Sequence, residues 1–347
     1  MTITEEYPQL DRLTCPAFVV QDDIITQANE AAIALGIPLN GHITPLIQGC
    51  AEPYTALESG QLCLSLHVGE TTLQAAVERT QQYDIFYLQT QYTDQQLRAF
   101  ALASQVLRDA LSNAMMAANT LSCEEEELPL LKKNLHSLHR TMCNMSDVTG
   151  FVNPRAVKLE NCDLTDFLDK LIMKTVRCLQ QSNYQVCFKN SCPSLICMAD
   201  REKLERGILN LIANAAKFSC QDDPIQMELH KTKSRLVFSV KNKTVVDPAM
   251  LHEHLFDQFR REPGLDPMSA GIGLGMTIVR GAAAAHNGTL LFDIPEAQTI
   301  RFTLSIPIRK TNLTELHTPL ITPMDYAGGY DHVKTELADV LSAELFD

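Results

Sequence analysis

The first part of the chain alternates short apolar runs with polar turns. One apolar run covers residues 17–20 and a second covers 24–26, and an alanine-rich stretch then leads from Asn29 to Gly36. Two further runs, rich in Tyr, Phe, Ile and Leu, flank a polar turn within residues 71–89. Runs of this length favour strands, and polar residues and glycine mark the turns between them. The pattern predicts a small α+β domain over residues 1–94.

Residues 95–152 change to a helical period. Apolar residues recur at helical spacing along the first half; they are Leu97, Phe100, Ala101, Val106, Leu107, Leu111, Met115, Ala118 and Leu121. An acidic stretch at 122–127 interrupts the pattern, and a second amphipathic run follows it. Two helices joined by a short polar turn form an antiparallel hairpin. Because one hairpin buries little apolar surface, we expect a homodimer in which two hairpins form a four-helix bundle.

The rest of the chain mixes both periods and then becomes acidic. Residues 153–308 alternate helices, strands and turns, which predicts a third domain and makes the chain a multidomain α+β protein. Residues 309–347 begin as a linker with Thr and Pro, and we expect them to end in an acidic amphipathic helix over 332–346. That helix either lies in solvent or docks on a partner or on the preceding domain.

Charge and cysteine usage narrow the class of protein. A net charge of −13 makes general binding to nucleic acid or to an anionic membrane unfavourable. The 11 cysteines include no CxxC pair, and the spacing of Cys187, Cys192 and Cys197 does not match usual zinc sites, which favours reduced thiols. The amino terminus lacks an apolar signal region, and no run of about 18 apolar residues occurs. We therefore expect a cytoplasmic protein with no membrane insertion.

The first candidate site lies in the predicted helix over residues 201–219. Arg206, Asn210, Asn214 and Lys217 share the face opposite to the apolar stripe. A carboxamide oxygen is a suitable ligand for Mg²⁺ that also holds phosphate oxygens, and a neighbouring lysine can meet the phosphate charge. The alternative is an ordinary amphipathic helix with two neutral surface residues.

Two further motifs follow this helix. Gly271, Gly273 and Gly275 precede a helix that we expect to start near Met276, and backbone amides at such a start attract phosphate. Between the two motifs, the segment 254–261 (HLFDQFRR) combines aromatic anchors with arginines. Taken alone, the glycine run is typical of a flexible turn, and the segment is typical of a short amphipathic helix.

In this order and spacing, the three motifs resemble those of a known family. NLIANAAKFS, LFDQF and GIGLGMTIV resemble the N box, F box and second glycine box of the histidine-kinase ATPase domain, and HNGTLLF and RFTLSIPI resemble its final strands. The resemblance covers residues 158–308 and implies the GHKL, or Bergerat, α/β sandwich with ATP and Mg²⁺ as ligands. The ATP-binding residues that it implies are Asn210, Asn214, Lys217, Asn242, Arg260, Gly271, Gly273, Leu274 and Gly275.

The resemblance also implies roles for individual residues and for the other domains. By position, Asn214 would bind Mg²⁺, Asn210 and Lys217 would support the phosphates, and the glycines would form the phosphate turn on the side of the lid. Residues 1–94 look like a PAS sensor domain, and residues 95–152 look like the dimerisation and phosphoacceptor hairpin. The family layout implies a homodimer, with a response regulator or another signalling protein as partner.

The chain departs from the family pattern at the phosphoacceptor position. The stretch SQVLRDAL aligns with the family motif, but Gln105 replaces the acceptor histidine and Val106 replaces the acid that follows it. Glutamine has no nucleophilic ring nitrogen, and valine cannot take a proton. The nearest histidines are His136 and His139 on the second helix. We expect them to be solvated or to face the dimer, and they are the alternative acceptors if the chain labels itself.

The second departure is the first glycine box. Asn242 stands where the family has the aspartate that recognises the adenine amino group, and the glycines after it are missing. The Asn242 oxygen can still accept a hydrogen bond from that amino group. Two hypotheses follow. The chain is a histidine-kinase-like enzyme that transfers a phosphoryl group to a protein, or it is a degenerate kinase that serves as a nucleotide- or ligand-regulated dimeric scaffold.

Overall fold

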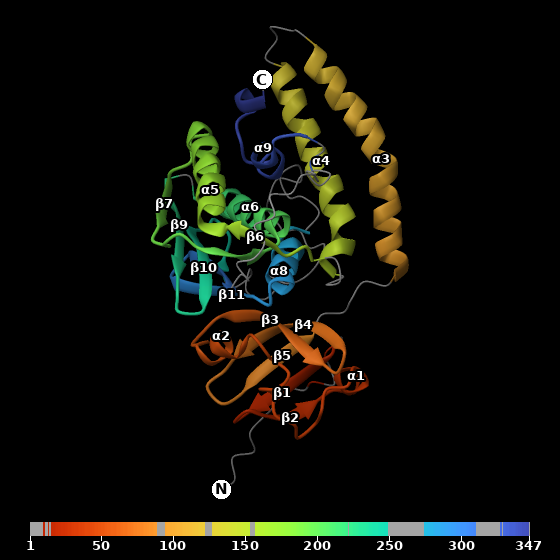
Figure 1. Cartoon of the computed structure of the whole chain (residues 1–347), viewed down its shortest axis with the longest axis vertical. Coiled ribbons are helices and arrows are strands. Elements are labelled where there is room, and N and C mark those ends of the chain that lie inside the picture. The colour runs from red at the N-terminus through yellow and green to blue at the C-terminus, as the bar shows by residue number, and fades with distance from the viewer. Residues whose placement is uncertain are drawn as a thin grey trace.

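The computed structural model describes residues 15–88, 94–121, 127–152, 157–220, 222–248, 274–309 and 329–346, with Leu10, Leu13 and Ala327. The fold is mixed α+β, with a large sheet and helices, which confirms the fold class predicted from the sequence. Figure 1 shows the amino-terminal strands at one end of the molecule, the carboxyl-terminal strands and helices in the middle, and two long helices along one side. No helix in the described ranges is long and apolar enough to cross a membrane.

The amino-terminal unit is a five-stranded antiparallel arrangement in the order β2-β1-β5-β4-β3. Its elements are β1 (Ala17–Gln21), β2 (Ile24–Ala28), α1 (Glu30–Ala34), α2 (Ala51–Thr55), β3 (Gln61–Val68), β4 (Thr71–Arg79) and β5 (Asp84–Leu88). The buried Asn29 begins α1, because its oxygen accepts from the Ala32 amide at 3.0 Å while its amide donates to the Cys15 carbonyl at 2.9 Å. One side chain thus caps the helix and fixes the start of the sheet.

Two long helices follow, where the pattern predicts a hairpin. They are α3 (Asp94–Thr120) and α4 (Glu127–Val152). Met115 and Ala118 of α3 and Met142 and Cys143 of α4 are buried. In Figure 1, α4 lies between α3 and the rest of the molecule. Several large apolar side chains of the pair remain exposed; they are Leu102, Val106, Leu107, Met116, Leu130, Leu131 and Leu138.

The third unit packs helices on one face of a mostly antiparallel sheet. It contains β6 (Glu160–Asp163), α5 (Leu164–Gln181), β7 (Val186–Asn190), β8 (Ile196–Ala199), α6 (Arg201–Phe218), β9 (Ile225–Lys231), β10 (Arg235–Lys243), α8 (Gly275–Ala285), β11 (Thr289–Glu296) and β12 (Thr299–Pro307). β7 pairs with β9 in parallel, and β6 and β8 form a separate pair. The helices bury their apolar stripes against the sheet in one continuous core.

The two sheets join at their edges. β3 pairs with β11 in antiparallel register, with Leu62 opposite Leu291, which makes a ten-stranded sheet among the described residues. Gly60 adopts a φ of +91° just before β3, and a Cβ atom there would lie 2.2 Å from the Phe292 carbonyl oxygen. Arg235 of β10 reinforces the joint by donating to the Gly49 carbonyl at 3.1 Å. Edge pairing of this kind covers backbone groups that would otherwise be unpaired.

The carboxyl-terminal segment differs from the predicted helix over 332–346. α9 covers only His332–Glu336, and after a turn the chain ends in the 3₁₀ helix η3 (Ala343–Phe346). The continuous-helix prediction is wrong because contacts with the rest of the molecule replace helical hydrogen bonds. The Ser342 amide donates to the Ser182 hydroxyl at 2.8 Å, and Leu341 and Phe346 are buried. α9 lies between α4 and α5, over α6 (Figure 1).

Candidate functional site

The site is built on α6, and local sequence accounts for that helix. Asp200 caps its first turn by accepting from the Lys203 amide at 3.1 Å. The apolar stripe is buried in the sheet-facing core; it contains Leu204, Ile208, Leu211, Ile212 and Ala215. Burial of that stripe leaves the opposite face, with Arg206, Asn210 and Asn214, to meet other elements.

The start of α8 lies against the two asparagines of α6. A Cβ atom on Gly275 would lie 3.1 Å from the Asn210 oxygen and 3.7 Å from the amide atoms of Asn214. The Asn214 amide also contacts the Met276 sulfur at 3.2 Å. Gly275 is the first residue of α8, so the helix begins one residue earlier than expected. This geometry brings two carboxamides, whose oxygens suit Mg²⁺, to a helix amino terminus, which favours a phosphate.

Asn242 provides a buried hydrogen-bond acceptor on β10. Its side chain is 2% exposed, and its amide donates to the Lys243 carbonyl at 3.0 Å. Its oxygen, however, is buried and accepts no hydrogen bond from any described residue. An unpaired buried carbonyl oxygen costs free energy, so a site of this kind is suited to a donor that arrives with a ligand.

Other predicted site residues are partly placed. Leu274 is buried at the start of α8, and the Lys217 ammonium lies 5.7 Å from the centre of the Phe218 ring. Arg260, Gly271 and Gly273 lie outside the described residues, as does the whole 254–261 motif. Their roles stay predictions.

Gln105 and Val106 lie on the exposed surface of α3. Val106 is 76% exposed and Gln105 is exposed beside it. The nearby histidines are not solvated as expected. His139 is 4% exposed, and the rings of both His136 and His139 pack against Tyr330 of the carboxyl-terminal segment at 5.6 Å. The prediction of solvated or dimer-facing histidines is therefore wrong, because the carboxyl-terminal segment covers them.

Burial has an electrostatic effect on His136. Desolvation, helped by the nearby His139 and Lys334, lowers the pKa of His136 to about 4, although Asp331 opposes the shift. The His136 ring nitrogen Nδ1 lies 3.0 Å from the Thr335 hydroxyl. The neutral imidazole is thus the form that the folded protein favours near neutral pH.

A buried ionic network beside the asparagines was not expected from the sequence. Glu336 is fully buried, and its oxygens lie 3.1 Å from Arg206 Nε, 3.1 Å from the Asn210 amide and 3.4 Å from Arg140 Nε. Arg140 also donates to the Asn210 oxygen at 3.2 Å and to Asp339 at 2.7 Å. The sequence signals were the Arg206 position on the asparagine face and the acidic amphipathic tail. Neither signal indicates that Arg206 pairs with Glu336 of the tail.

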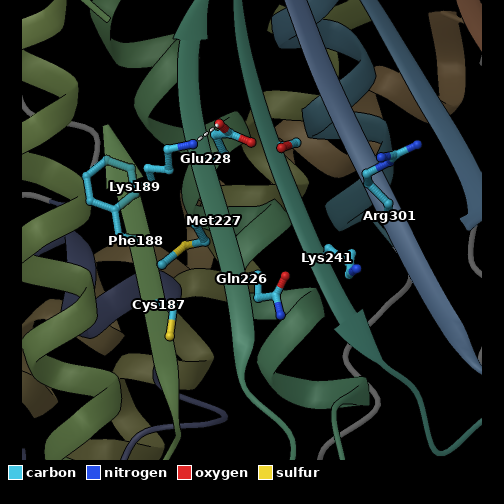
Figure 2. A pocket seen from close by; sticks show the side chains of 9 residues that line it. Cys187, Phe188, Lys189, Gln226, Met227, Glu228, Lys241 and Arg301 are labelled. Atoms are coloured by element: carbon cyan, nitrogen blue, oxygen red, sulfur yellow. Dashed lines mark hydrogen bonds and ion pairs between the residues drawn. The ribbon is translucent and has the colours of Figure 1, made fainter. Parts of the chain in front are cut away.

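A separate hollow lies on the face of the sheet opposite to the helices. It is open, about 380 Å³ in volume, and lined by residues of β7, β9, β10 and β12. Figure 2 shows Cys187, Lys189 and Glu228 projecting from neighbouring strands, with the helices behind the sheet. Its charges are paired, since Lys189 lies 3.3 Å from Glu228 and Lys241 lies 3.5 Å from Glu296. It presents no unpaired buried group among its described residues.

Comparison with known proteins matches the part of the chain that contains these elements. The profile of the family described as "Histidine kinase-, DNA gyrase B-, and HSP90-like ATPase" matches residues 199–310, which include α6, β10 and α8. Hybrid signal transduction histidine kinase D of Dictyostelium discoideum is 25% identical over 297 residues, or 78% of this chain and 18% of that protein. The adaptive-response sensory-kinase SasA of Prochlorococcus marinus is 22% identical over 229 residues, or 62% of this chain and 60% of that protein.

Among solved structures, full-length ShkA in complex with AMPPNP has a similar fold. Its TM-score is 0.50 at 20% identity, and the match covers 62% of this chain and 46% of that chain. The chain spans less than two thirds of the length of each of these three proteins. Residues 199–310 thus match the histidine-kinase-like ATPase family, and the histidine kinases among the relatives of this chain support a sensor histidine kinase family.

Proposed function

We propose that this chain binds Mg-ATP between α6, β10 and α8, and that it relays a signal as a homodimer. In this proposal Asn214 is the Mg²⁺ ligand, and Asn210 and Lys217 support the phosphates. The observation that carries it is the approach of both asparagines to the start of α8. The Asn214 amide contacts the Met276 sulfur at 3.2 Å, and a Cβ atom on Gly275 would lie 3.1 Å from the Asn210 oxygen. ShkA was solved in complex with AMPPNP, an ATP analogue, which supports a nucleotide as the ligand of this fold.

The free acceptor of Asn242 supports adenine as the base. An adenine amino group would donate the hydrogen bond that the buried Asn242 oxygen lacks among the described residues. The residues in place therefore fit both ends of the ligand. The amide oxygens suit the metal and phosphates, and Asn242 suits the base. Bound Mg²⁺ would neutralise phosphate charge there.

Calorimetry with Mg-AMPPNP tests nucleotide binding directly. We expect wild-type protein to bind and Asn214→Ala to lose at least about tenfold in affinity, because a metal ligand is removed. Asn134→Ala is the matched control, since Asn134 is an exposed asparagine on α4. Absence of binding by folded wild-type protein at millimolar nucleotide would refute the proposal.

A second function, the degenerate kinase scaffold, is favoured by the exposed Gln105 and the covered histidines. With glutamine at the acceptor position, a phosphoryl group would have to go to another side chain, in this chain or in a partner such as a response regulator. Incubation with γ-labelled ATP and Mg²⁺ separates the functions. Acid-labile, alkali-stable label on the wild-type chain supports the kinase and points to His136 or His139. No label, with label appearing on Gln105→His, indicates that only the acceptor is missing.

The other domains complete the proposal. The strand order β2-β1-β5-β4-β3 supports a PAS-like sensor over residues 1–94. The exposed apolar residues of α3 and α4 support a dimerisation hairpin over 95–152, and the ATPase domain and tail occupy 153–308 and 309–347. We propose a cytoplasmic location and no contact with nucleic acid, in keeping with the acidic charge of −13.

A further inference from the structure

The carboxyl-terminal segment Tyr330–Phe346 makes polar contacts with both the hairpin and the ATPase helices. Toward α4, Asp339 accepts from Ser137 at 2.5 Å and from Arg140 at 2.7 Å. Toward α5, Asp331 pairs with Lys174 at 2.7 Å. The segment therefore holds the two parts of the chain against each other.

Contacts with α6 bring the segment to the proposed nucleotide site. His332 lies 2.7 Å from Glu205, and Glu336 contacts Arg206 and Asn210, each at 3.1 Å. Glu336 is 0% exposed, so its charge is held by the two arginines and not by water. Burial of a carboxylate costs hydration free energy unless charged partners compensate for it. The buried position of Glu336 is therefore a specific contact, unlike that of a solvated residue in a tail.

The position of Glu336 conflicts with a nucleotide. The Asn210 oxygen lies 3.1 Å from the place that a Cβ atom on Gly275 would take, and the Asn210 amide donates to Glu336, so only the Asn210 side chain separates the carboxylate from the start of α8. Phosphates bound there would bring several negative charges toward Glu336 in a region of low dielectric. Removal of the segment would take away Glu336 and Asp339 and leave Arg140 and Arg206 beside Asn210, a change that favours an anion.

We propose that the segment Tyr330–Phe346 is an autoinhibitory latch that opposes Mg-nucleotide binding through Glu336. The proposal rests on the proposed function, since it concerns the same site. The docked segment lowers the affinity for the nucleotide, and the bound nucleotide lowers the affinity for the docked segment by the same factor. Release of the latch also uncovers His136 and His139 and removes the link between α4 and α6 that runs through Glu336, so nucleotide occupancy and hairpin position are coupled.

Calorimetry with Mg-AMPPNP on full-length variants tests the latch. Glu336→Gln keeps the shape and one acceptor oxygen but removes the charge, and we expect at least about tenfold tighter binding than wild type. Glu344→Gln is the matched control, because Glu344 is an exposed residue of the same segment, and its affinity should stay within about twofold of wild type. Equal affinity of wild type and Glu336→Gln would overturn the latch and leave the nucleotide site standing.

Two further measurements keep the test decisive. If circular dichroism shows that Glu336→Gln does not fold, Asp339→Asn replaces it, because Asp339 holds the segment to α4 without contacting Asn210. Asp339→Asn should also bind nucleotide more tightly, and unchanged affinity counts against the latch. In wild-type protein, saturating Mg-AMPPNP should speed hydrogen exchange of the Leu337 and Leu341 amides. If no variant binds nucleotide, the proposed function fails, and the latch fails with it.

Discussion

At the scale of single residues, the buried asparagines Asn242 and Asn210 differ in how fully their side chains are hydrogen-bonded. Both are buried in the core of the ATPase domain. Asn210 has every side-chain atom engaged, by Arg140, Glu336 and its own helix. Asn242 keeps a buried oxygen without a described donor. Because an unpaired acceptor destabilises the folded state, its retention is best explained by a ligand that satisfies it.

Replacement of Asn242 should change stability and affinity in opposite directions. Asn242→Leu removes the unpaired oxygen and fills similar volume, so we expect an unchanged or higher melting temperature. The same change removes the acceptor for adenine, and Mg-AMPPNP affinity should fall about tenfold to a hundredfold. Differential scanning calorimetry and titration calorimetry measure the two effects. A lower melting temperature with unchanged affinity would show that the Asn242 oxygen has a structural role instead.

The low pKa of His136 predicts acid sensitivity. Burial holds that pKa at about 4, below the 6.5 of an unfolded histidine, so the unfolded chain binds a proton that the folded chain does not. This contribution to stability is complete above pH 6.5 and is lost as the pH falls toward 4. Allowing for partial solvent screening, the loss is about 1–2 kcal/mol.

Urea unfolding of wild type and His136→Gln between pH 7.5 and 4.5 measures this effect. The variant should lose less stability on acidification than wild type, because glutamine cannot take up the proton in the unfolded state. His42→Gln is the control, since the His42 side chain is 66% exposed, and its pH dependence should follow that of wild type. Parallel curves for wild type and His136→Gln would count against a neutral, buried His136.

At the scale of elements, the joint between β3 and β11 links the amino-terminal unit directly to the ATPase domain. Leu290, Leu291 and Phe292 of β11 pair with β3, so a strand that belongs to one unit continues the sheet of the other. A change in the amino-terminal sheet can therefore reach β11 without passing through α3 and α4. The joint depends on Gly60, where the backbone of Phe292 leaves no room for a side chain.

A pair of glycine substitutions isolates the joint. Gly60 and Gly69 both have positive φ, at +91° and +58°. A Cβ atom on Gly60 would clash with the Phe292 backbone, whereas a Cβ atom on Gly69 would have no atom within 4 Å. Gly69→Ala should cost about 1 kcal/mol from backbone strain, and Gly60→Ala should cost about 1–3 kcal/mol more through the clash. Urea unfolding gives the costs, and hydrogen exchange of the Leu291 and Phe292 amides should accelerate only in Gly60→Ala. Similar exchange in both variants would argue that the joint is absent in solution.

At the scale of the whole molecule, the hairpin leaves an apolar surface that a single chain does not cover. Leu102, Val106 and Leu138 are 63%, 76% and 58% exposed, which is unusual for a group of large apolar residues on one pair of helices. The carboxyl-terminal segment covers the other side of α4, toward α6. The amino-terminal unit, the ATPase domain and the proposed latch are thus joined in one chain, and the exposed hairpin face is where we propose that a second copy binds.

The dimer can be tested by charge insertion on that face. Leu102→Glu should convert a dimer to a monomer in sedimentation analysis, because burying an unpaired carboxylate costs several kcal/mol. Leu39→Glu is the matched control, with a leucine that is 49% exposed in the amino-terminal unit, and should leave the sedimentation unchanged. A wild-type monomer at high protein concentration would refute the homodimer proposal.

Patterns local in the sequence determined much of this protein. The helical period from 201 to 219 predicted α6 because its apolar stripe must be buried whatever surrounds it, and α6 spans Arg201–Phe218. The mixed α+β fold class followed from local periods, and the resemblance to histidine kinases followed from the residues of three sequence motifs. The ATP-site roles of Arg260, Gly271 and Gly273 stay predictions, since those residues lie outside the described parts of the chain.

Only the tertiary structure decided which distant segments meet. Glu336 and Arg206 are 130 positions apart, and periodicity carries no information about a pair at that separation. The same holds for β3 on β11 and for the segment that covers His136 and His139. The terminal helix was predicted too long because an isolated helix of this length is marginal, while burial of Leu341 and Phe346 favours a bend. Local pattern fixes elements, but long-range packing selects their partners.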